Sequence, residues 1–419
     1  MALALRGIRI LDLTDAVAGP FATMLLAGCG AEVIRVESRR HLGFRTGVPP
    51  AGGGGALQIP EDQIDFSKVD MSLLVGTNFH RYNRDKLSVA LNLTKPEARE
   101  IFKKLVPLSD VIVDNLSFGV VPKWGFDYDA LKQLRNNIIV VSMPSLGKGP
   151  HEQWTTWGMN LLSFTGFAYK WGHPDTPMEE RVANNTYADY ISGMKTVSAI
   201  LAALYHRAKT GEGQYIEVAQ AEATASLLGL SYIDYFINNR VTPPRGNRHP
   251  QFAPYNSYRC KGDDRWCVIS VFSEGEWQQL RRALDSPKWT EDPKFRDMEA
   301  RLKNVDELDR NIENWTRQHT PHQVMKILQS SGIAAGAVQN GEDLYFDIQL
   351  RERGHMLDID THKQGRVTFD GPPLHLAVGQ KTETQGAPIL GEHNDYVYKQ
   401  LLGLSSDEID KLTEAKVIF

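Results

Sequence analysis

Short apolar runs alternate with helix-forming segments through the first 145 residues, and this alternation constrains the fold more than any other feature of the sequence. The spacing of apolar residues predicts helices over residues 21–27, 95–106 and 128–134. Strands that alternate with helices are typical of a doubly wound, Rossmann-like α/β sheet with parallel strands. Ligands of such sheets bind beyond the carboxyl ends of the strands. The runs that predict strands cover residues 8–13, 31–37, 87–93, 109–113 and 137–143.

A different pattern follows a helix expected at residues 221–239. Residues 240–256 form a linker rich in Pro, Arg and Gly, and the apolar residues on either side of Gly262 predict a β-hairpin. Helices and a strand-like run follow, which indicates a smaller α+β domain. The predicted division is a large domain of residues 1–220 completed by 385–419, a linker helix 221–239, a small domain 240–345, and a return linker 346–384 with a short sheet of residues 365–369 and 374–376.

The composition argues against several classes of function. The chain has 419 residues and a net charge of −4, without blocks of like charge, so a nucleic-acid surface is not expected. The three cysteines lack the spacing of zinc ligands, which indicates a reduced, cytoplasmic chain without a metal, and no apolar run is long enough for a membrane span. Gly28 and Gly30 close the first helix instead of opening it, so the fingerprint of a dinucleotide site fails and no permanently bound cofactor is expected.

Asp189 ends a polar run, directly before a helix expected from about Tyr190 to Ala208. An Asp at this place is most often the N-cap, because its carboxylate accepts hydrogen bonds from unpaired backbone N–H groups. The same place also suits a carboxylate nucleophile that forms a covalent acyl intermediate, since the helix dipole favours the ionised form. The residue types alone leave both interpretations open.

The segment at residues 154–171 is unusually aromatic. Core or interface packing is the ordinary reason for such a segment, because aromatic side chains dominate both. The functional interpretation is one wall of a pocket for an acyl or aryl group. Its aromatic members are Trp154, Trp157, Phe164, Phe167, Tyr169 and Trp171.

Several short motifs occur in the same order as in the class III CoA-transferases of the CaiB/BaiF type, the family of formyl-CoA transferase and carnitine CoA-transferase. Residues 5–20 resemble the opening of these proteins, and residues 30–37 follow at the matching distance. The resemblance extends over nearly the whole chain. Its further motifs are Asn83-Arg84-Asp85-Lys86, residues 109–115, Gly125-Phe126, residues 210–214, Gly332-Ile333 and Leu390-Gly391-Glu392-His393.

The resemblance implies that Asp189 is the nucleophile. The family's catalytic Asp lies a few residues before a Gly, here Gly193, and upstream of a stretch that matches Ala202-Ala203-Leu204 and residues 210–214. The ionised carboxylate would attack an acyl-CoA thioester and pass through anhydride and aspartyl-CoA thioester states. Backbone N–H groups near Val17 and Ala18 are candidates for stabilising the oxyanion.

The resemblance also implies a set of residues that bind CoA, which is a substrate here and not a resident cofactor. Two departures from the family are visible. Ser38 stands where a basic residue is usual, and the glycine-rich loop of formyl-CoA transferase has no counterpart near residues 245–254, which argues against oxalate or formate as the acyl group. The expected contacts are Val17 and Ala18 near the pantetheine, Arg39 or Arg40 at the adenosine phosphate, and Leu91, Asn92, Asn115, Leu116 and Lys123 along the nucleotide.

The expected function is intermolecular CoA transfer from an acyl-CoA such as succinyl-CoA to a carboxylic acid, with a bulky or aromatic acid such as benzylsuccinate as the expected acceptor. Two alternatives remain. Acyl-CoA racemases of the same fold need a His, but Met159 stands in the corresponding Gly158-Met159-Asn160 motif. The chain could also be a non-catalytic subunit paired with a paralogue. The family further implies an intertwined dimer of interlocked rings, either of identical chains or with a related one.

Overall fold

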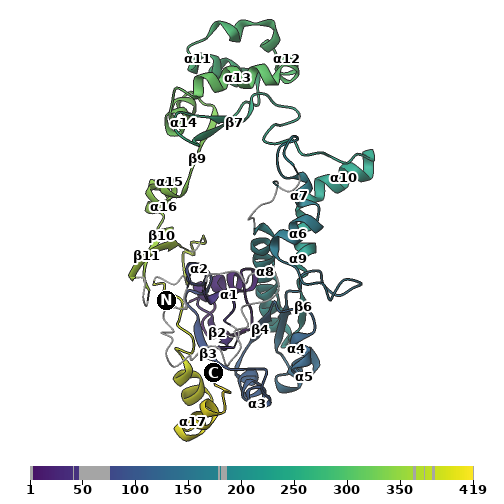
Figure 1. Ribbon diagram of the computed structural model, residues 1–419, viewed down its shortest axis with the longest axis vertical. Helices are drawn as coiled ribbons and strands as arrows, with labels where there is room; N and C mark the ends of the chain where they lie inside the picture. The colour runs from purple at the N-terminus through teal and green to yellow at the C-terminus, as the bar shows by residue number, and fades with distance from the viewer. Residues whose placement is uncertain are drawn as a thin grey trace. The chain divides into compact units, whose positions relative to one another are not determined.

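A computed structural model describes residues 3–40, 42–46, 76–177, 180, 186–361, 365–371, 373–379 and 383–418. The chain divides into two compact units (Figure 1). The first comprises Met1–Ala168, Val182–Arg240 and Glu352–Phe419, and the second comprises Tyr169–Arg181 and Val241–Arg351. In the described part of the chain, no helix combines the length and the apolar character that a membrane span requires.

The first unit is built on a sheet of six parallel strands in the order β3-β2-β1-β4-β5-β6. This is the strand order of a Rossmann-like fold, so the predicted doubly wound α/β architecture is confirmed. The order reverses between β1 and β4, and a ligand crevice is expected at that point. The strands are β1 (Arg9–Asp12), β2 (Glu32–Glu37), β3 (Leu87–Ala90), β4 (Val111–Asp114), β5 (Ile139–Ser142) and β6 (Tyr215–Glu217).

Alternate residues of each strand face opposite sides of this sheet, and helices cover both sides. Ile10, Val33 and Val111 pack with helices α1 (Ala18–Gly28) and α8 (Tyr187–Thr210). Leu11, Ile34 and Ile112 face the other side, where α3 (Pro96–Leu105), α5 (Tyr128–Leu134) and α17 (Ser406–Glu414) pack. Because both faces are covered, the strands are mostly apolar, as the sequence predicted, with charged residues such as Asp12 and Glu37 at their carboxyl ends.

Shorter elements connect and extend this framework. The predicted helix over residues 221–239 is interrupted by a 3-10 turn at Ser226–Leu228, which leaves α9 and α10. The C-terminal segment adds a π-helical turn at Tyr396–Leu401. The remaining elements are a 3-10 turn at Gly43–Thr46, α2 (Thr77–Asn83), a 3-10 turn at Val106–Leu108, α4 (Val120–Lys123), α6 (Gly158–Phe164), α7 (Phe167–Lys170), α9 (Gln220–Ala225) and α10 (Gly229–Asn238).

One predicted strand pairing is wrong. β11 (Gly365–Asp370) pairs with β10 (Met356–Thr361), whereas residues 374–376 form no strand. In β10, Leu357 and Ile359 alternate with the exposed Asp358 and Asp360, which is the pattern of a strand with one buried face. The run has only 6 residues, and no strand was predicted there.

The second unit contains a three-stranded antiparallel sheet, which confirms the predicted hairpin. Its core includes the buried side chains of Trp277, Ile312 and Leu328. The elements are β7 (Tyr255–Arg259), β8 (Trp266–Ser270), β9 (Ala334–Val338), 3-10 turns at Lys288–Glu291 and Pro293–Phe295, and helices α11 (Glu274–Ala283), α12 (Met298–Lys303), α13 (Val305–Thr316), α14 (Pro321–Ser330), α15 (Gly341–Phe346) and α16 (Ile348–Glu352).

Candidate active site

Asp189 lies inside the first turn of α8, because the helix begins at Tyr187 and not at Tyr190 as predicted. Thr186 occupies the N-cap position, and the backbone N–H of Asp189 donates to its carbonyl oxygen at 3.0 Å. The interpretation of Asp189 as the N-cap is therefore wrong. Its own backbone N–H and that of Ala18, the first residue of α1, face its carboxylate and stabilise the charged form. A negative charge at the start of α1 is favoured by that helix's dipole.

Two glycines permit the close packing around this carboxylate. A Cβ atom on Gly158, the first residue of α6, would lie 2.1 Å from Asp189 Oδ2. A Cβ atom on Gly193, one turn further along α8, would lie 2.8 Å from the carbonyl oxygen of Ala18. Any larger residue at either position would force the carboxylate or the start of α1 to move.

The environment of Asp189 raises the pKa of its carboxyl group to about 6. Burial is the largest cause, and the two backbone N–H groups partly oppose it. No charged side chain in the described residues contributes to this shift. At neutral pH the group is therefore mostly ionised but more basic than an ordinary carboxylate, which suits it to nucleophilic attack.

The loop between β1 and α1 leads to the Ala18 N–H group, and side chains from two other segments hold this loop. Arg35 donates to the carbonyl oxygen of Thr14 at 2.7 Å. Asn115, at the end of β4, accepts from the N–H of Asp15 and donates to its carbonyl oxygen, both at 2.7 Å. Ala16 has a positive φ of 61°, so these contacts fix an uncommon backbone conformation. Both polar groups of the Asn115 side chain therefore bind the backbone of Asp15, and not the cavity where CoA was expected.

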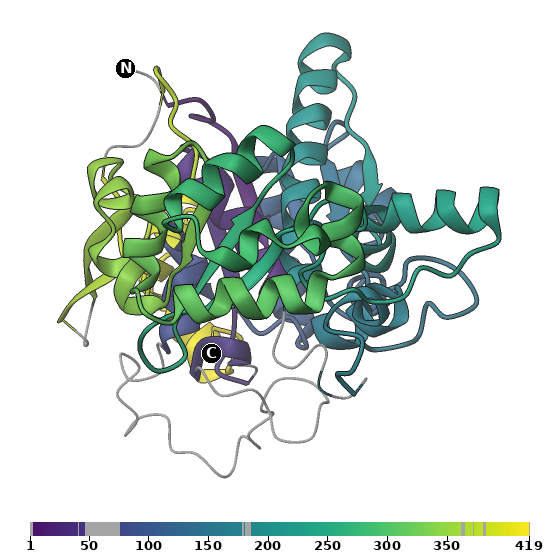
Figure 2. The ribbon, with the colours of Figure 1, turned by 90° about the horizontal axis from the view of Figure 1, so that it is seen from above.

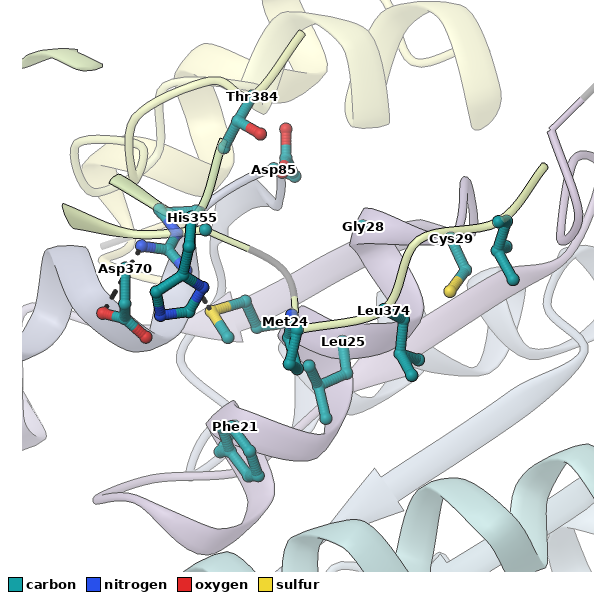
Figure 3. A pocket seen from close by; sticks show the side chains of 14 residues that line it. Phe21, Met24, Leu25, Gly28, Cys29, Asp85, His355, Asp370, Leu374 and Thr384 are labelled. Atoms are coloured by element: carbon teal, nitrogen blue, oxygen red, sulfur yellow. Dashed lines mark hydrogen bonds and ion pairs between the residues drawn. The ribbon is translucent and has the colours of Figure 1, made fainter. Parts of the chain in front are cut away.

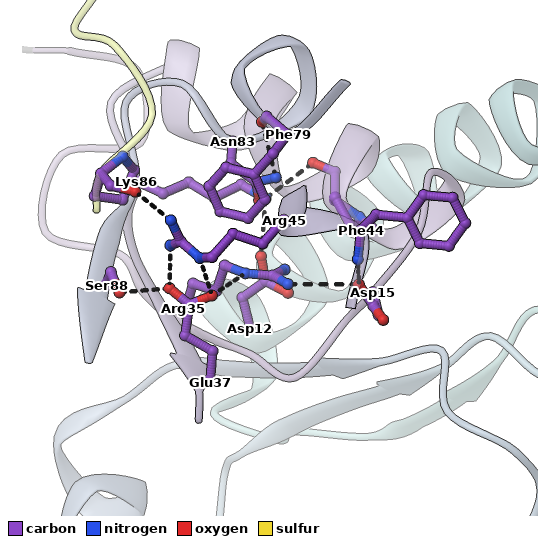
Figure 4. A network of polar contacts seen from close by, with 12 residues as sticks. Asp12, Asp15, Arg35, Glu37, Phe44, Arg45, Phe79, Asn83, Lys86 and Ser88 are labelled. Atoms are coloured by element: carbon purple, nitrogen blue, oxygen red, sulfur yellow. Dashed lines mark hydrogen bonds and ion pairs between the residues drawn. The ribbon is translucent and has the colours of Figure 1, made fainter. Parts of the chain in front are cut away.

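A buried network of charges lies beneath this loop (Figure 4). Lys86 Nζ donates to Asp12 Oδ2 at 2.9 Å, to the carbonyl oxygen of Pro20 in α1 at 3.0 Å, and to Asn83. Glu37 pairs with both Arg35 and Arg45. Burial lowers the pKa of Lys86 to about 8, despite the attraction of Asp12. Every charge in this network has a partner, so the network supports the first turn of α1 and is not itself reactive.

A cavity of about 390 Å³ lies beyond the carboxyl ends of β1, β2, β3 and β4, where the fold predicts a ligand. Asn92 is 1% exposed and lines this cavity, and its Nδ2 group has no hydrogen-bond partner among the described residues. A buried donor without a partner is costly unless a ligand accepts from it. The lining residues are Leu13, Thr14, Asp15, Arg35, Val36, Glu37, Ser38, Arg40, Leu91, Asn92, Leu93, Thr94, Leu116, Ser117, Val120 and Trp124.

The cavity brings together four of the expected CoA contacts, namely Arg40, Leu91, Asn92 and Leu116. Val17 and Ala18 lie instead at the start of α1, beside Asp189. Arg39, Asn115 and Lys123 do not belong to the described lining, although Lys123 ends α4, whose Val120 does. Thr14 and Asp15 line the cavity and lie on the loop that ends at Ala18, so this loop connects the cavity to the carboxylate.

Sequence reasoning missed several residues of this region. Trp124 and Arg35 line the cavity, and Gly158 contacts Asp189, yet none of the three was expected there. Trp124 follows the short α4 and could have been suspected from its place after a strand end. Arg35 lies within a strand, and no sequence signal marks its contact with the loop.

Aromatic side chains occur on both sides of Asp189. Trp157, directly before Gly158, packs against Phe44 with ring centroids 5.6 Å apart. Tyr187, two residues before Asp189, stacks on Phe167 with ring centroids 6.1 Å apart. Part of the predicted aromatic segment therefore lies next to residues that contact the carboxylate.

Comparison with known proteins decides the family. The sequence pattern of CoA-transferase family III matches residues 5–394. The chain belongs to this family. It is therefore an enzyme of the CoA-transferase type, whose substrates are an acyl-CoA and a carboxylic acid.

Curated relatives and a solved structure agree with this assignment. A probable CoA-transferase of Mycobacterium tuberculosis is 30% identical over 99% of this chain, which spans 50% of that protein's length. The succinyl-CoA:mesaconate CoA-transferase of Haloarcula hispanica is 29% identical over 93% of this chain and 94% of its own. The crystal structure of a CaiB/BaiF family protein from Brucella suis superposes with a TM-score of 0.82 at 26% identity, covering 96% of this chain and 100% of the other.

Proposed function

We propose that this CoA-transferase moves CoA from succinyl-CoA to a second carboxylic acid, with Asp189 as the nucleophile. One observation carries the proposal: the only partners that the described residues give the Asp189 carboxylate are backbone N–H groups, at a helix start joined to a cavity of ligand size. A carboxylate in a purely structural role is usually paired with a cation, as Asp12 is with Lys86.

The proposed reaction passes through four exchanges at one carboxylate. Asp189 attacks the thioester carbonyl of the donor, and the CoA thiolate leaves as a mixed anhydride forms. The thiolate attacks the aspartyl carbonyl of this anhydride, which releases succinate and gives an aspartyl thioester. The acceptor carboxylate attacks that thioester and expels the thiolate, which then attacks the acceptor's acyl carbonyl. The new acyl-CoA leaves and the Asp189 carboxylate is restored.

The N–H group of Ala18 is well placed to support these steps. It faces the carboxylate in the resting protein and stabilises its charged form. The same N–H group can stabilise the oxyanion that develops when the aspartyl carbonyl is attacked, because the start of α1 favours negative charge. Val17 and Ala18 would then lie beside the thioester end of the pantetheine.

The cavity is the proposed binding site for the nucleotide part of CoA. Arg40 is the exposed cation of the lining and would pair with a phosphate, with Arg39 beside it and Lys123 at the end of α4. Asn92 would donate its free Nδ2 to the ligand, and Leu91 and Leu116 supply apolar contact. Trp124 offers a ring face on which adenine can stack.

A bulky or aromatic acceptor acid, such as benzylsuccinate, is the finer part of this proposal. The pairs formed by Trp157 with Phe44 and by Tyr187 with Phe167 place aromatic rings on the segments that flank Asp189. A site lined by aromatic rings binds an acid that carries a ring better than a short, strongly hydrated dicarboxylate, because rings stack face to face or face to edge. The donor is proposed from the succinyl-CoA named for the Haloarcula relative.

Dimer formation is a further part of the proposal. Helix α10 projects from its unit (Figures 1 and 2), and its side chains Leu230, Phe236 and Ile237 are 85%, 91% and 75% exposed. So many large apolar side chains on one exposed helix are unusual for a monomer. A second copy of this chain, or a paralogue, would bury them.

An exchange assay with a panel of acids tests the proposal. Purified protein is incubated with succinyl-CoA and one acid at a time, and new acyl-CoA is measured by mass spectrometry. We expect transfer to an aromatic succinate derivative, and loss of transfer in Asp189→Asn. Asp129→Asn changes an exposed Asp in the first turn of α5 and serves as the matched control. Transfer by Asp189→Asn at the wild-type rate would refute the assigned nucleophile, and deuterium exchange at the α-carbon without transfer would indicate a racemase.

A further inference from the structure

A second, smaller pocket lies along the C-terminal half of α1, in the same unit as Asp189 (Figure 3). Its volume is about 160 Å³, close to the liquid volume of five water molecules. Most of its wall is apolar, with a few polar groups at one side. The lining residues are Phe21, Met24, Leu25, Gly28, Cys29, Arg84, Asp85, His355, Asp370, Gly371, Pro373, Leu374, Leu376 and Thr384.

Arg84 is a buried cation of this pocket whose hydrogen-bond donors are only weakly used by the described residues. Its side chain is 4% exposed, and Nη1 has no hydrogen-bond partner among the described residues. Nη2 reaches only the sulfur of Met24, at 3.6 Å, which is a weak acceptor. The desolvation by the surrounding side chains lowers the pKa of Arg84, as expected for a guanidinium with few compensating bonds. A buried cation in this state is stabilised by any ligand that supplies an acceptor oxygen.

With Arg84 counted, the charged groups around the pocket in the described residues are two carboxylates, Asp370 and Asp85, and two guanidinium groups, Arg84 and Arg81, so the charges balance. Asp370 lies 3.9 Å from Arg84 Nη1, beyond hydrogen-bond distance, and 3.4 Å from Arg81. Asp85 accepts the backbone N–H of Gln385, and His355 lines the same side. Long-range attraction of an anion is therefore weak. Recognition must depend on the direct bond to Arg84 and on the fit to the apolar wall.

We propose that this pocket binds a short-chain monocarboxylate of about six non-hydrogen atoms. The carboxylate would accept hydrogen bonds from Arg84, the strongest donor available to it. The alkyl chain would lie against Met24, Leu25 and Leu376. This site is separate from the CoA cavity, and the proposal stands whether or not Asp189 is the nucleophile.

Phe21 connects this pocket to the catalytic helix. Its ring lines the pocket and also packs edge-on against Tyr190, the residue after Asp189, with ring centroids 5.1 Å apart. A Cβ atom on Gly193 would lie 2.8 Å from the same ring. A ligand that restrains Phe21 therefore restrains the first turn of α8. Occupancy of the pocket by a small carboxylic acid would therefore alter the mobility of the helix turn that carries Asp189, which couples the concentration of such an acid to the candidate active site.

Calorimetric titration with butyrate tests the site directly. The full wild-type chain is used without any acyl-CoA, so that no acyl transfer can occur and residues 187–193 keep their own sequence. Gly28→Leu is the main variant, because Gly28 lines the pocket and its added Cβ would meet no atom within 4 Å. Gly149→Leu, at an exposed Gly with the same free space, is the control. Arg84→Met removes the hydrogen-bond donor.

We expect butyrate to bind the parent and the Gly149→Leu variant equally. Gly28→Leu should abolish binding, and Arg84→Met should weaken it at least about tenfold, as expected for a hydrogen bond to a charged group. Amide hydrogen exchange in residues 187–193 should slow when butyrate binds the parent. Unchanged binding by Gly28→Leu would overturn the site, and binding without slower exchange would overturn the link to α8. Neither result would affect the proposed CoA transfer.

Discussion

Two carboxylates near the start of α1, those of Asp12 and Asp189, have opposite surroundings. Asp12 is paired with a cation, whereas Asp189 is faced only by backbone N–H groups among the described residues. Asp12 is fully buried but paired with Lys86 and hydrogen-bonded by Thr14 and Thr23. The attraction of Lys86 and the hydrogen bonds outweigh the effect of burial and lower the pKa of Asp12. Asp189 is less buried, but only backbone N–H groups face it, and its pKa rises to about 6.

This difference supports the proposal that Asp12 is a structural charge and Asp189 a reactive one. The carboxylate oxygens of Asp12 and Glu37 are already bound by cations and hydroxyl groups, so these residues stabilise the fold and are poor nucleophiles. The Asp189 carboxylate has no cation beside it in the described residues, so its lone pairs remain available. For the same reason its ionised form is less stable, and its pKa is raised. The same helix start that Lys86 anchors through Pro20 supplies the N–H group that holds Asp189 in place.

The largest effect is expected from Asp189→Asn. It should reduce the turnover number for CoA transfer by at least about 10³-fold, because the amide cannot form the covalent intermediate.

The folded-state pKa of Asp189 is raised, so its ionisation lowers the free energy of unfolding as the pH rises from about 4 to 6. Asp189→Asn should therefore be at least as stable as the wild type near pH 8. Chemical denaturation at that pH gives the comparison, and a clear loss of stability would place Asp189 with the structural charges.

Lys86→Met should have the largest effect on stability. It leaves the fully buried Asp12 carboxylate without its cation, which typically lowers the free energy of unfolding by about 3–5 kcal/mol. Lys103→Met breaks an exposed pair with Glu100 and should cost less than about 0.5 kcal/mol. Urea titrations of both variants measure these values. Equal stabilities would mean that the buried network does not support α1.

Asn115 and Asn92 were both expected to contact CoA, but the structure gives them different surroundings. Asn115→Leu removes both hydrogen bonds to Asp15, so it should lower the acylation rate constant about tenfold while changing the KM for the acyl-CoA much less. Asn92→Ala should mainly raise that KM. Steady-state and single-turnover kinetics separate the two effects. The reverse pattern would assign CoA contact to Asn115.

The pH dependence of acylation tests the raised pKa of Asp189. Only the ionised carboxylate attacks, so the single-turnover rate constant should rise about tenfold between pH 5 and pH 7 and level off above that. Rapid mixing with succinyl-CoA, quenched in acid, measures the rate constant. A rate constant that is already constant at pH 5 would mean that Asp189 titrates like the paired carboxylates.

The sequence predicted the sheet well, because strands such as β1 and β4 are buried on both faces and are therefore mostly apolar. It did not identify β10, although Leu357 and Ile359 alternate with the exposed Asp358 and Asp360, because a run of 6 residues gives a weak signal. Asp189 was proposed as the nucleophile only through the spacing of a family motif, since its residue type favoured a cap. The bond between Asn115 and Asp15 joins residues 100 positions apart, and the unpartnered nitrogen of Arg84 arises from packing. Neither the Asn115–Asp15 bond nor the unbonded nitrogen of Arg84 can be predicted from the residues that are neighbours in the sequence.

The most direct test of Asp189 as the nucleophile is the mass of the protein after incubation with succinyl-CoA followed by hydroxylamine. Hydroxylamine converts an aspartyl anhydride or thioester to a hydroxamate, and peptide mapping locates it. We predict a hydroxamate at Asp189 in the wild type and in Asp129→Asn, and none in Asp189→Asn. A hydroxamate on another residue, or an unmodified Asp189 during active CoA transfer, would contradict the account.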